Sequence, residues 1–558
     1  MVIFNSILAL LAGVGVFIVG MNMLSQSLQK VAGSGMKRLI GKITTNRFAG
    51  VGIGALVTGI IQSSAATTVM AIGFVNVGTM TLSQATSVIM GANIGTTVTG
   101  LLVSLSSFDV GIYASVLAFI GVMLQFIKND KVKNIGGIIC GLGLIFIGLD
   151  LMSGSFNNDE IKSFIQNIFS NIDFPLLLLL LGIIFTALMQ SSSAMTGLVI
   201  IMVASNAMPF KSGLFVILGA NIGTCITALI ATIGTNINAK RTGFIHLLFN
   251  VIGVFIFTII VWSFSDSIIN ILNTIFGNNY SIEIAVFHIV FNVTTTLLLL
   301  PFIKYLVRIA QLVIKDKKND VSNVIKYIDN RLLMTPPIAF EQVKKEIINM
   351  AILSHENYKM AVEELFSQDG KNVGKINKHE DEIDYMNSEI TKFLIKLSPL
   401  LNGQNEKILG SYFHVVNDIE RIGDYAQNFS EFSIKMKNDN FKFSNVALNE
   451  LKQMCDNVEE MYSIAIDILS NGKFEELDRL SKLEEMTDEY KEKFSAKHFE
   501  RLSQENCSME LGAYYITIIS QIERVGDHIV NIGFSTKNPT GDQNLYVKWK
   551  NKIRYKQF

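Results

Sequence analysis

The chain has 558 residues, too many for one ordinary domain, so two or more folding units are expected. Hydrophobic residues make up 49% of the chain and charged residues 17%, less charge than the roughly 25% typical of soluble domains. Only 20 of the 94 Lys, Arg, Asp and Glu residues lie in the first 300 positions. This division excludes a single soluble enzyme, a disordered chain and a strongly basic nucleic-acid-binding protein, and it indicates a membrane half joined to a soluble half.

Nine apolar segments follow one another in the first half, with an amphipathic stretch near 267–277. They lie at about 2–24, 48–77, 84–107, 110–127, 134–156, 174–204, 212–235, 242–264 and 284–304. Most have the roughly 20 residues that a helix needs to span a bilayer. The chain has only seven prolines, and its first segment lacks the cationic start of a signal peptide, so we predict an all-α polytopic membrane unit that begins with a retained transmembrane helix.

Two polar motifs recur in this half at a spacing of 128 residues. Gln-Ser-Ser at 62–64 returns at 190–192, and Gly-Ala-Asn-Ile-Gly-Thr at 91–96 returns at 219–224. Because one fixed offset holds through several segments, the membrane half is interpreted as an internal duplication.

Two of the apolar segments, 48–77 and 174–204, are too long for a single span. As straight helices they would measure about 45 Å, against a bilayer core of roughly 30 Å, and each has Gln-Ser-Ser in its middle. Irregular backbone at membrane depth is tolerated only inside protein or beside a wet cavity. We therefore predict two re-entrant hairpins that turn near the bilayer centre.

The loop charges indicate that the two copies are inverted. The loop before the first hairpin carries five basic residues and no acid, whereas the matching loop of the second copy carries three acids and one lysine. The positive-inside rule places the first loop in the cytoplasm and the second outside. We expect transmembrane repeat 1 at 1–128 and transmembrane repeat 2 plus a final helix at 129–310, with the hairpins entering from opposite faces, as in many secondary transporters.

Neutral polar residues form the candidate binding site, because the spans contain no Lys or Arg and Asp150 is the one acid well inside a span. Serine and glutamine donors beside the start of a broken helix suit an oxyanion, and hydroxyl and carbonyl oxygens suit sodium. The candidate ligands are Gln62, Ser63, Ser64, Thr67, Thr68, Asn93, Thr96, Gln190, Ser191, Ser192, Ser193, Thr196, Asn221 and Thr224.

Helix packing is the alternative interpretation of these small polar residues. We interpret the Gln-Ser-Ser pair as a binding site because it occupies matching places in inverted copies, and both interpretations stay open for the Gly-Ala-Asn-Ile-Gly-Thr runs. Asp150 has no acidic counterpart, since Asn22 is the equivalent residue, and it is interpreted as structural or cavity-lining. The His-x-x-Phe-Asn runs at 246–250 and 288–292 are interpreted as core packing.

The stretches 62–68 and 190–196 resemble the paired Gln-Ser-Ser signatures of the type II sodium/phosphate cotransporter family. The resemblance covers about residues 1–310. It implies sodium-driven uptake of inorganic phosphate, with both hairpins lining the site. The chain departs from the family pattern at Ala65, where the first motif often continues with a third serine, so the number and position of the sodium sites stay open.

The charged half is also duplicated. We expect a linker at 311–340, which includes Pro336-Pro337, then a helical domain at 341–535 and a C-terminal tail at 536–558. The motif Glu-Arg-x-Gly-Asp ends at Asp424 and returns 103 residues later.

Acid pairs at i, i+4 on earlier helices put further carboxylates on one helix face of each copy. Such faces can hold a cluster of metal ions with oxygen ligands, or they can be solvated surfaces with arginine partners. The candidate metal ligands are Glu380, Asp384, Glu420, Asp424, Glu484, Asp488, Glu523 and Asp527. The motif resembles PhoU-like domains, and the resemblance, over about 340–535, implies two three-helix units able to bind iron or zinc clusters, with a phosphate-linked regulatory role in place of catalysis.

These observations predict a secondary transporter of the bacterial inner membrane with a cytoplasmic PhoU-like domain. Its partners would be inorganic phosphate, sodium and membrane lipid, and no nucleic acid; a homo-oligomer or a phosphate-signalling partner through the C-terminal domain is also possible. The four scattered cysteines predict neither a disulfide framework nor a zinc site, and no enzyme motif is present. Phosphate export, proton coupling and a non-transporting signalling protein are the alternatives.

Overall fold

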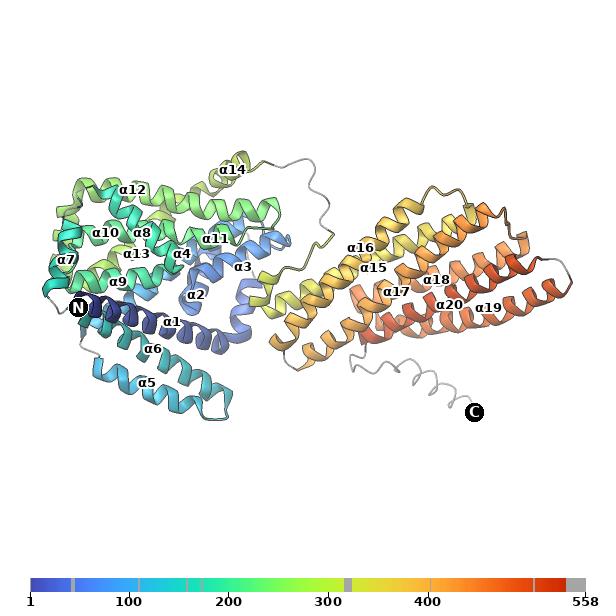
Figure 1. Ribbon diagram of the computed structural model, residues 1–558, viewed down its shortest axis with the longest axis horizontal. Coiled ribbons are helices and arrows are strands. Elements are labelled where there is room, and N and C mark those ends of the chain that lie inside the picture. The colour runs from blue at the N-terminus through green and yellow to red at the C-terminus, as the bar shows by residue number, and fades with distance from the viewer. Residues whose placement is uncertain are drawn as a thin grey trace. The chain divides into compact units, whose positions relative to one another are not determined.

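The computed structural model describes residues 2–41, 46–108, 111–156, 159–170, 172, 174–315, 324–401, 403–504 and 507–537. The chain forms two compact units, Met1–Lys318 and Asn319–Phe558 (Figure 1). The described residues are helical and include no strand, which confirms the all-α prediction. Residues 316–323 of the expected linker and 538–558 of the expected tail lie outside the described residues.

The first unit is built from helices that follow the predicted apolar segments. They are α1 (Val2–Gly41), α2 (Arg47–Ile61), α3 (Ser64–Asn76), α4 (Leu82–Ser104), η1 (Leu105–Phe108), α5 (Gly111–Gln125), α6 (Asp130–Ser155), α7 (Asp159–Ser170), α8 (Pro175–Met189), α9 (Ser192–Ala204), α10 (Phe210–Gly223), α11 (Cys225–Ile230), α12 (Ile237–Phe276), α13 (Tyr280–Leu299), η2 (Leu300–Phe302) and α14 (Ile303–Val313). Within the described residues, six helical stretches are long and apolar enough to cross a membrane.

The two long polar-centred segments are each divided into a pair of short helices, α2 with α3 and α8 with α9. Each member of a pair has 13 or 15 residues, so neither alone reaches across a bilayer core. The division agrees with the predicted hairpins, while their path through a bilayer stays a prediction.

Helices α1 and α6, which correspond to each other in the duplication, pack side by side (Figure 1). A Cβ atom added at Gly20 would lie 2.9 Å from the carbonyl oxygen of Gly141, and one added at Gly148 would lie 2.8 Å from that of Gly13. Later residues of α1 therefore contact earlier residues of α6, so the two helices are antiparallel. Because they are equivalent elements, the two copies are inverted, as the loop charges predicted.

The same close helix contact occurs once in each copy, between α2 and α4 and between α8 and α10. A Cβ atom added at Gly54 would lie 2.0 Å from the carbonyl oxygen of Val88, and one at the equivalent Gly182 would lie 2.2 Å from that of Val216. Backbone meets backbone here, so a side chain can be accommodated only if the helices separate.

We expect Gly54→Ala and Gly182→Ala each to lower the free energy of unfolding of the first unit by about 1–3 kcal/mol, because the added methyl group overpacks a backbone contact. Thermal unfolding of the detergent-solubilised chain measures this. Gly52→Ala is the matched control, since a Cβ atom at this position of α2 would have no neighbour within 4 Å. Equal stability of the control and the two variants would contradict the assignment.

The second unit consists of long helices arranged as two successive sets of three. Its elements are η3 (Asn330–Met334), α15 (Pro336–Ser367), α16 (Val373–Leu397), η4 (Ser398–Leu400), α17 (Gln404–Asn438), α18 (Asn445–Asn471), η5 (Phe474–Glu476), α19 (Leu477–Ser503) and α20 (Met509–Lys537). The sets α15–α17 and α18–α20 contact each other through α17 with α20 and α15 with α18. This arrangement places the two copies of the acidic motif on the neighbouring helices α17 and α20.

The segment that enters this unit is held by one buried carboxylate. Oε2 of Glu346 on α15 accepts hydrogen bonds from the backbone N–H groups of Lys326 at 2.9 Å, Ile328 at 3.2 Å and Tyr327. Because Glu346 is fully buried, three backbone donors satisfy a group that would otherwise be costly to bury. The entry segment of the second unit is therefore attached to α15 at Lys326–Ile328.

Candidate functional site

The helix breaks at Gln62 and Gln190 have the same backbone geometry. Gln62 has φ 58° and ψ 27°, and Gln190 has φ 52° and ψ 25°, both in the left-handed region. The next residue in each copy, Ser63 or Ser191, is extended, and its Oγ accepts a hydrogen bond of 3.2 Å from the backbone N–H of the residue three positions later. Each Gln-Ser-Ser motif thus ends one helix and caps the N-terminus of the next.

The two new helices, α3 and α9, begin at buried serines in the interior of the unit. Ser64 and Ser192 are their first residues, with exposed fractions of 6% and 7%. A helix N-terminus presents unsatisfied backbone N–H groups and a positive dipole end, which favour an anion. The hydroxyl groups of the same serines add donors beside it.

Thr99 of α4 connects the two motifs and was missed by the sequence analysis. Its hydroxyl donates to Oε1 of Gln62 at 2.8 Å and accepts from Oγ of Ser193 at 3.3 Å. The sequence held a signal for it, since Thr99 and Thr227 are a threonine pair at the 128-residue offset. One hydroxyl group therefore bonds both to the first Gln-Ser-Ser motif, through Gln62, and to the residue that follows the second motif, Ser193.

The predicted threonines Thr67, Thr68 and Thr196 lie in α3 and α9, in the first turns after the two helix breaks. Thr67 accepts a hydrogen bond of 2.9 Å from Thr58, which joins α3 to α2. Thr68 and its counterpart Thr196 are 1% and 2% exposed, and their hydroxyl groups have no hydrogen-bond partner among the described residues. A matched pair of unpaired buried hydroxyls is costly unless a ligand uses them.

The glycines of the Gly-Ala-Asn-Ile-Gly-Thr runs pack helices together. They make the backbone contacts with α2 and α8, and the hydroxyls of Thr96 and Thr224 bond back to carbonyls four residues earlier, both at 3.1 Å. Both asparagines are buried. Asn221 bonds its own helix at 2.9 Å and lies 3.5 Å from Nε2 of His288, whereas Nδ2 of Asn93 has no partner among the described residues.

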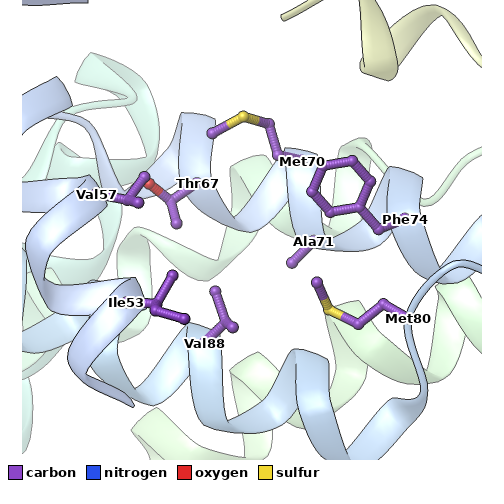
Figure 2. Close-up of a pocket in the computed structure, with 8 residues that line it drawn as sticks. All are labelled: Ile53, Val57, Thr67, Met70, Ala71, Phe74, Met80 and Val88. Carbon is purple, nitrogen blue, oxygen red and sulfur yellow. The ribbon is translucent and has the colours of Figure 1, made fainter. Parts of the chain in front are cut away.

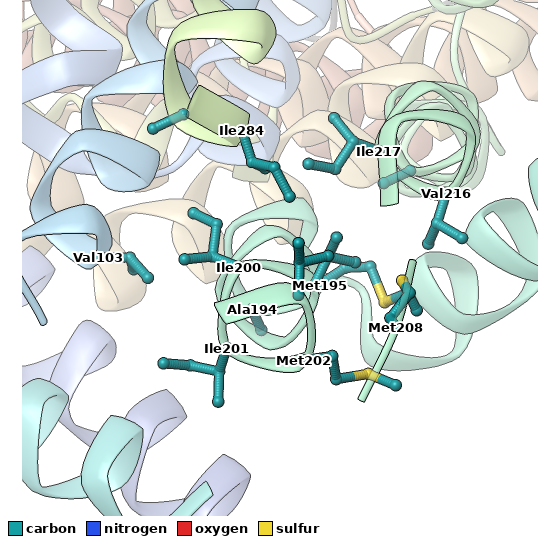
Figure 3. Packing of buried hydrophobic residues seen from close by; sticks show 14 of the residues in the cluster. Val103, Ala194, Met195, Ile200, Ile201, Met202, Met208, Val216, Ile217 and Ile284 are labelled. Carbon is teal, nitrogen blue, oxygen red and sulfur yellow. The ribbon is translucent and has the colours of Figure 1, made fainter. Parts of the chain in front are cut away.

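The two hairpins are packed differently. A pocket lined by residues of α2, α3, the α3–α4 loop and α4, among them Thr67 and Ala71, lies beside the first hairpin (Figure 2). The equivalent residues of the second copy are the larger Met195 and Val199, which belong to a buried cluster. Figure 3 shows Met195 of α9 in that cluster with Val216 of α10. Thr67 and Ala71 are as buried as Met195 and Val199, so the two copies differ here in the size of the side chains.

Exposure also differs between the copies. Gln62 is 8% exposed, whereas the equivalent Gln190 is an exposed residue. Asp150 and its counterpart Asn22 are both exposed. His246 and His288 are buried, which agrees with their interpretation as core residues.

In the second unit the candidate metal ligands form two groups of three carboxylates. One oxygen of each residue lies within 4.8 Å of the others in Glu380, Asp384 and Asp424, and likewise in Glu484, Asp488 and Asp527. Three closely spaced carboxylate oxygens suit a cation with oxygen ligands.

The motif glutamates, Glu420 and Glu523, lie outside both groups. Each is paired with a basic residue, Glu523 with Lys491 at 3.0 Å and Glu420 with Arg421 at 3.9 Å. Arg421 also pairs with Asp424 of the first group, at 3.2 Å, so a basic partner does not by itself distinguish the two interpretations, and both stay open.

The carboxylates of the first group, Glu380, Asp384 and Asp424, repel one another when they are ionised. Burial and the neighbouring carboxylates of Asp384 and Asp424 raise the pKa of Glu380 from 4.5 to about 7. Burial and the neighbouring carboxylate of Asp424 raise the pKa of Asp384 as well. Bound cations would relieve this repulsion and compete with protons for the same oxygens.

The antiparallel repeats, the two broken helices and the six long apolar stretches define a multi-pass membrane protein with the architecture of secondary transporters. Comparison with known proteins gives the family. The model of the Na+/Pi-cotransporter family matches residues 16–154 and 155–279, and the PhoU domain matches residues 347–433 and 451–536.

Relatives resemble the whole chain or its first half. "Putative inorganic phosphate export protein YjbB" of Salmonella typhimurium is 22% identical over 546 residues, covering 96% of this chain and 99% of the relative. "Uncharacterized protein YqeW" of Bacillus subtilis is 31% identical over 305 residues, 54% of this chain and 96% of the relative. "Sodium-dependent phosphate transport protein 2B" of Pongo abelii is 37% identical over 109 residues, 18% of this chain and 15% of the relative.

The chain therefore belongs to the Na+/Pi-cotransporter family and carries a C-terminal PhoU domain. The family resemblance inferred from the paired Gln-Ser-Ser motifs is confirmed.

We expect the metal-free second unit to lose about 1–3 kcal/mol of stability as the pH rises from about 5 to about 7.5. The reason is that the folded-state pKa of Glu380, about 7, exceeds its ordinary value of 4.5. Protonation thus stabilises the fold below the ordinary pKa, and this contribution is lost as the pH rises through the folded value. Amide hydrogen exchange of α16 in chelator, corrected for the intrinsic effect of pH, measures the change.

Glu380→Gln should flatten this pH dependence because the amide does not ionise. The control is Glu382→Gln on the same helix, where Glu382 pairs with Lys378 at 3.4 Å. If Glu380→Gln keeps the full pH dependence of the unaltered chain, the assignment to Glu380 is wrong.

Proposed function

We propose that this protein is a sodium-coupled secondary transporter of inorganic phosphate in the bacterial cytoplasmic membrane. The observation that carries the proposal is the pair of identical helix breaks, joined through Thr99, that begin α3 and α9 at buried serines. Membership of the Na+/Pi-cotransporter family supports phosphate as the anion and sodium as the coupling ion.

Phosphate would bind where the two helix N-termini converge. Backbone N–H groups at the starts of α3 and α9 and the hydroxyls of Ser64 and Ser192 would donate to its oxygens. Its charge would be balanced by sodium bound to neighbouring hydroxyl and carbonyl oxygens, since the site itself is neutral. Thr68 and Thr196, whose buried hydroxyls have no partner among the described residues, are proposed cation ligands, one in each hairpin.

Alternating access would use the inverted repeats. Two copies of one fold in opposite orientation can exchange conformations, so that the state open to one side becomes the state open to the other.

Phosphate export is the second candidate. A relative that aligns with 96% of this chain is named for inorganic phosphate export, and the net direction of a secondary transporter follows from the gradients of its substrates. The residues of the site would be the same in both directions.

The PhoU domain would regulate transport from the cytoplasm. Three carboxylate oxygens within 4.8 Å of one another in each copy fit a divalent or trivalent cation, and iron and zinc are the proposed ions. When bound, the metal would supply positive charge that joins α16 to α17 and α19 to α20. Glu380, Asp384 and Asp424 would hold it in the first copy, and their equivalents would hold it in the second.

Proteoliposomes containing the full chain test the transport proposal. Labelled phosphate should accumulate when an inward sodium gradient is imposed and should leave preloaded vesicles when the gradient is reversed. Phosphate movement driven by a proton gradient alone would show that the coupling ion is the proton and not sodium. Absence of phosphate movement under all gradients, with protein present in the vesicles, would refute transport and favour a signalling protein.

We expect Ser64→Ala and Ser192→Ala each to lower the initial rate of phosphate uptake about tenfold or more, because each removes a donor beside a helix N-terminus at the proposed anion site. Ser205→Ala is the matched control, since Ser205 lies at the far end of α9 and its hydroxyl bonds its own helix at 2.7 Å. If both variants take up phosphate as fast as the control, the two hairpins do not form the phosphate site.

A further inference from the structure

The hydrogen bonds around Thr99 have only one possible direction. The amide nitrogen of Gln62 donates to the carbonyl oxygen of Gly59, and a carbonyl oxygen can only accept. The amide oxygen of Gln62 must therefore face Thr99, whose hydroxyl donates to it at 2.8 Å. A hydroxyl has one proton, so the contact of 3.3 Å with Ser193 has Ser193 as the donor.

This direction decides what Ser193 can offer a ligand. Once its proton is used toward Thr99, Ser193 presents only the lone pairs of Oγ to the space around the helix break. Lone pairs bind a cation, whereas an oxyanion requires donors. Thr99 itself is 1% exposed and uses its proton and at least one lone pair within the protein, so it orients the site without needing to touch the ligand.

The hydrogen bonds made by Thr99 have no equivalent at Thr227, the matching residue of the second copy. In the second copy the residue equivalent to Thr99 is Thr227, whose hydroxyl donates to the carbonyl oxygen of Thr224 on its own helix at 2.8 Å. The residue equivalent to Ser193 in the first copy is Ala65, which has no hydroxyl to offer Thr227. The symmetry of the repeats is therefore broken at this contact.

We propose that Thr99 is a positioning residue that fixes Ser193 as an acceptor, so that the second hairpin supplies a ligand for a coupling cation at this place and the first hairpin does not. The proposal rests on the sodium-coupled transport proposed above and assigns a residue to one of its two substrates. Loss of the Thr99 hydroxyl frees the proton of Ser193 to point at the ligand space, which weakens cation binding specifically.

The test is phosphate uptake by proteoliposomes of the full chain, with sodium varied at saturating phosphate and phosphate varied at saturating sodium. Thr99→Val keeps the shape and removes the hydroxyl; it should raise the KM for sodium about fivefold or more and leave the KM for phosphate within about twofold. Thr99→Ser should restore the sodium KM of the unaltered chain. Thr227→Val, the matched control in the second copy, should change neither constant.

Ser193→Ala should raise the sodium KM as well, and the double variant with Thr99→Val should be no weaker in sodium binding than Ser193→Ala alone, because both changes act through one oxygen. An unchanged sodium KM in Thr99→Val, or an equal rise in both constants, overturns the proposal. If Thr99→Val does not fold, an unchanged sodium KM in Ser193→Ala overturns it.

Absence of sodium dependence in the unaltered chain would overturn the proposed function and this inference together. Sodium dependence that Thr99→Val and Ser193→Ala leave unchanged would overturn this inference alone.

Discussion

The first unit depends on a helix that stops and restarts inside an apolar segment. A continuous helix satisfies its own backbone, so an interruption exposes N–H and C=O groups that must find partners where water is scarce. At Gln62 and Gln190 one left-handed residue ends the first helix, and a serine cap satisfies one donor of the next. The remaining N–H donors at the starts of α3 and α9 are available to an anion. The helix break therefore lowers stability and at the same time provides groups that can bind an anion.

Close backbone contact supports these interruptions. Glycines on α2 and α4, and their equivalents on α8 and α10, bring the first arm of each hairpin against the following helix without intervening side chains. The antiparallel contact of α1 with α6 relates the copies by inversion. The candidate site residues on separate helices are in this way held by main-chain packing, which side-chain motion disturbs little.

The two copies share a backbone but differ in the side chains that surround it. Met195 and Val199 replace Thr67 and Ala71, and Ser193 replaces Ala65. Thr99 consequently contacts the first hairpin through Gln62 and the second through the hydroxyl of Ser193, for which the first copy has no equivalent. The two copies of one fold therefore surround the helix breaks with different side chains. In the PhoU domain, Glu523 and Glu420 likewise lie outside the two groups of closely spaced carboxylates.

The sequence by itself determined the helical class, the duplication, the inversion of the copies and the positions of both helix breaks, because hydropathy, loop charge and a fixed repeat offset are properties of the chain order. It also identified the family from the paired Gln-Ser-Ser motifs. Only the tertiary structure decided that Thr99 joins the two motifs, that the Gly-Ala-Asn-Ile-Gly-Thr glycines pack helices, and that six of eight carboxylates cluster. These facts depend on which side chains of distant helices meet, and the direction of a buried hydroxyl's single proton follows from its neighbours in space, which the order of residues does not specify.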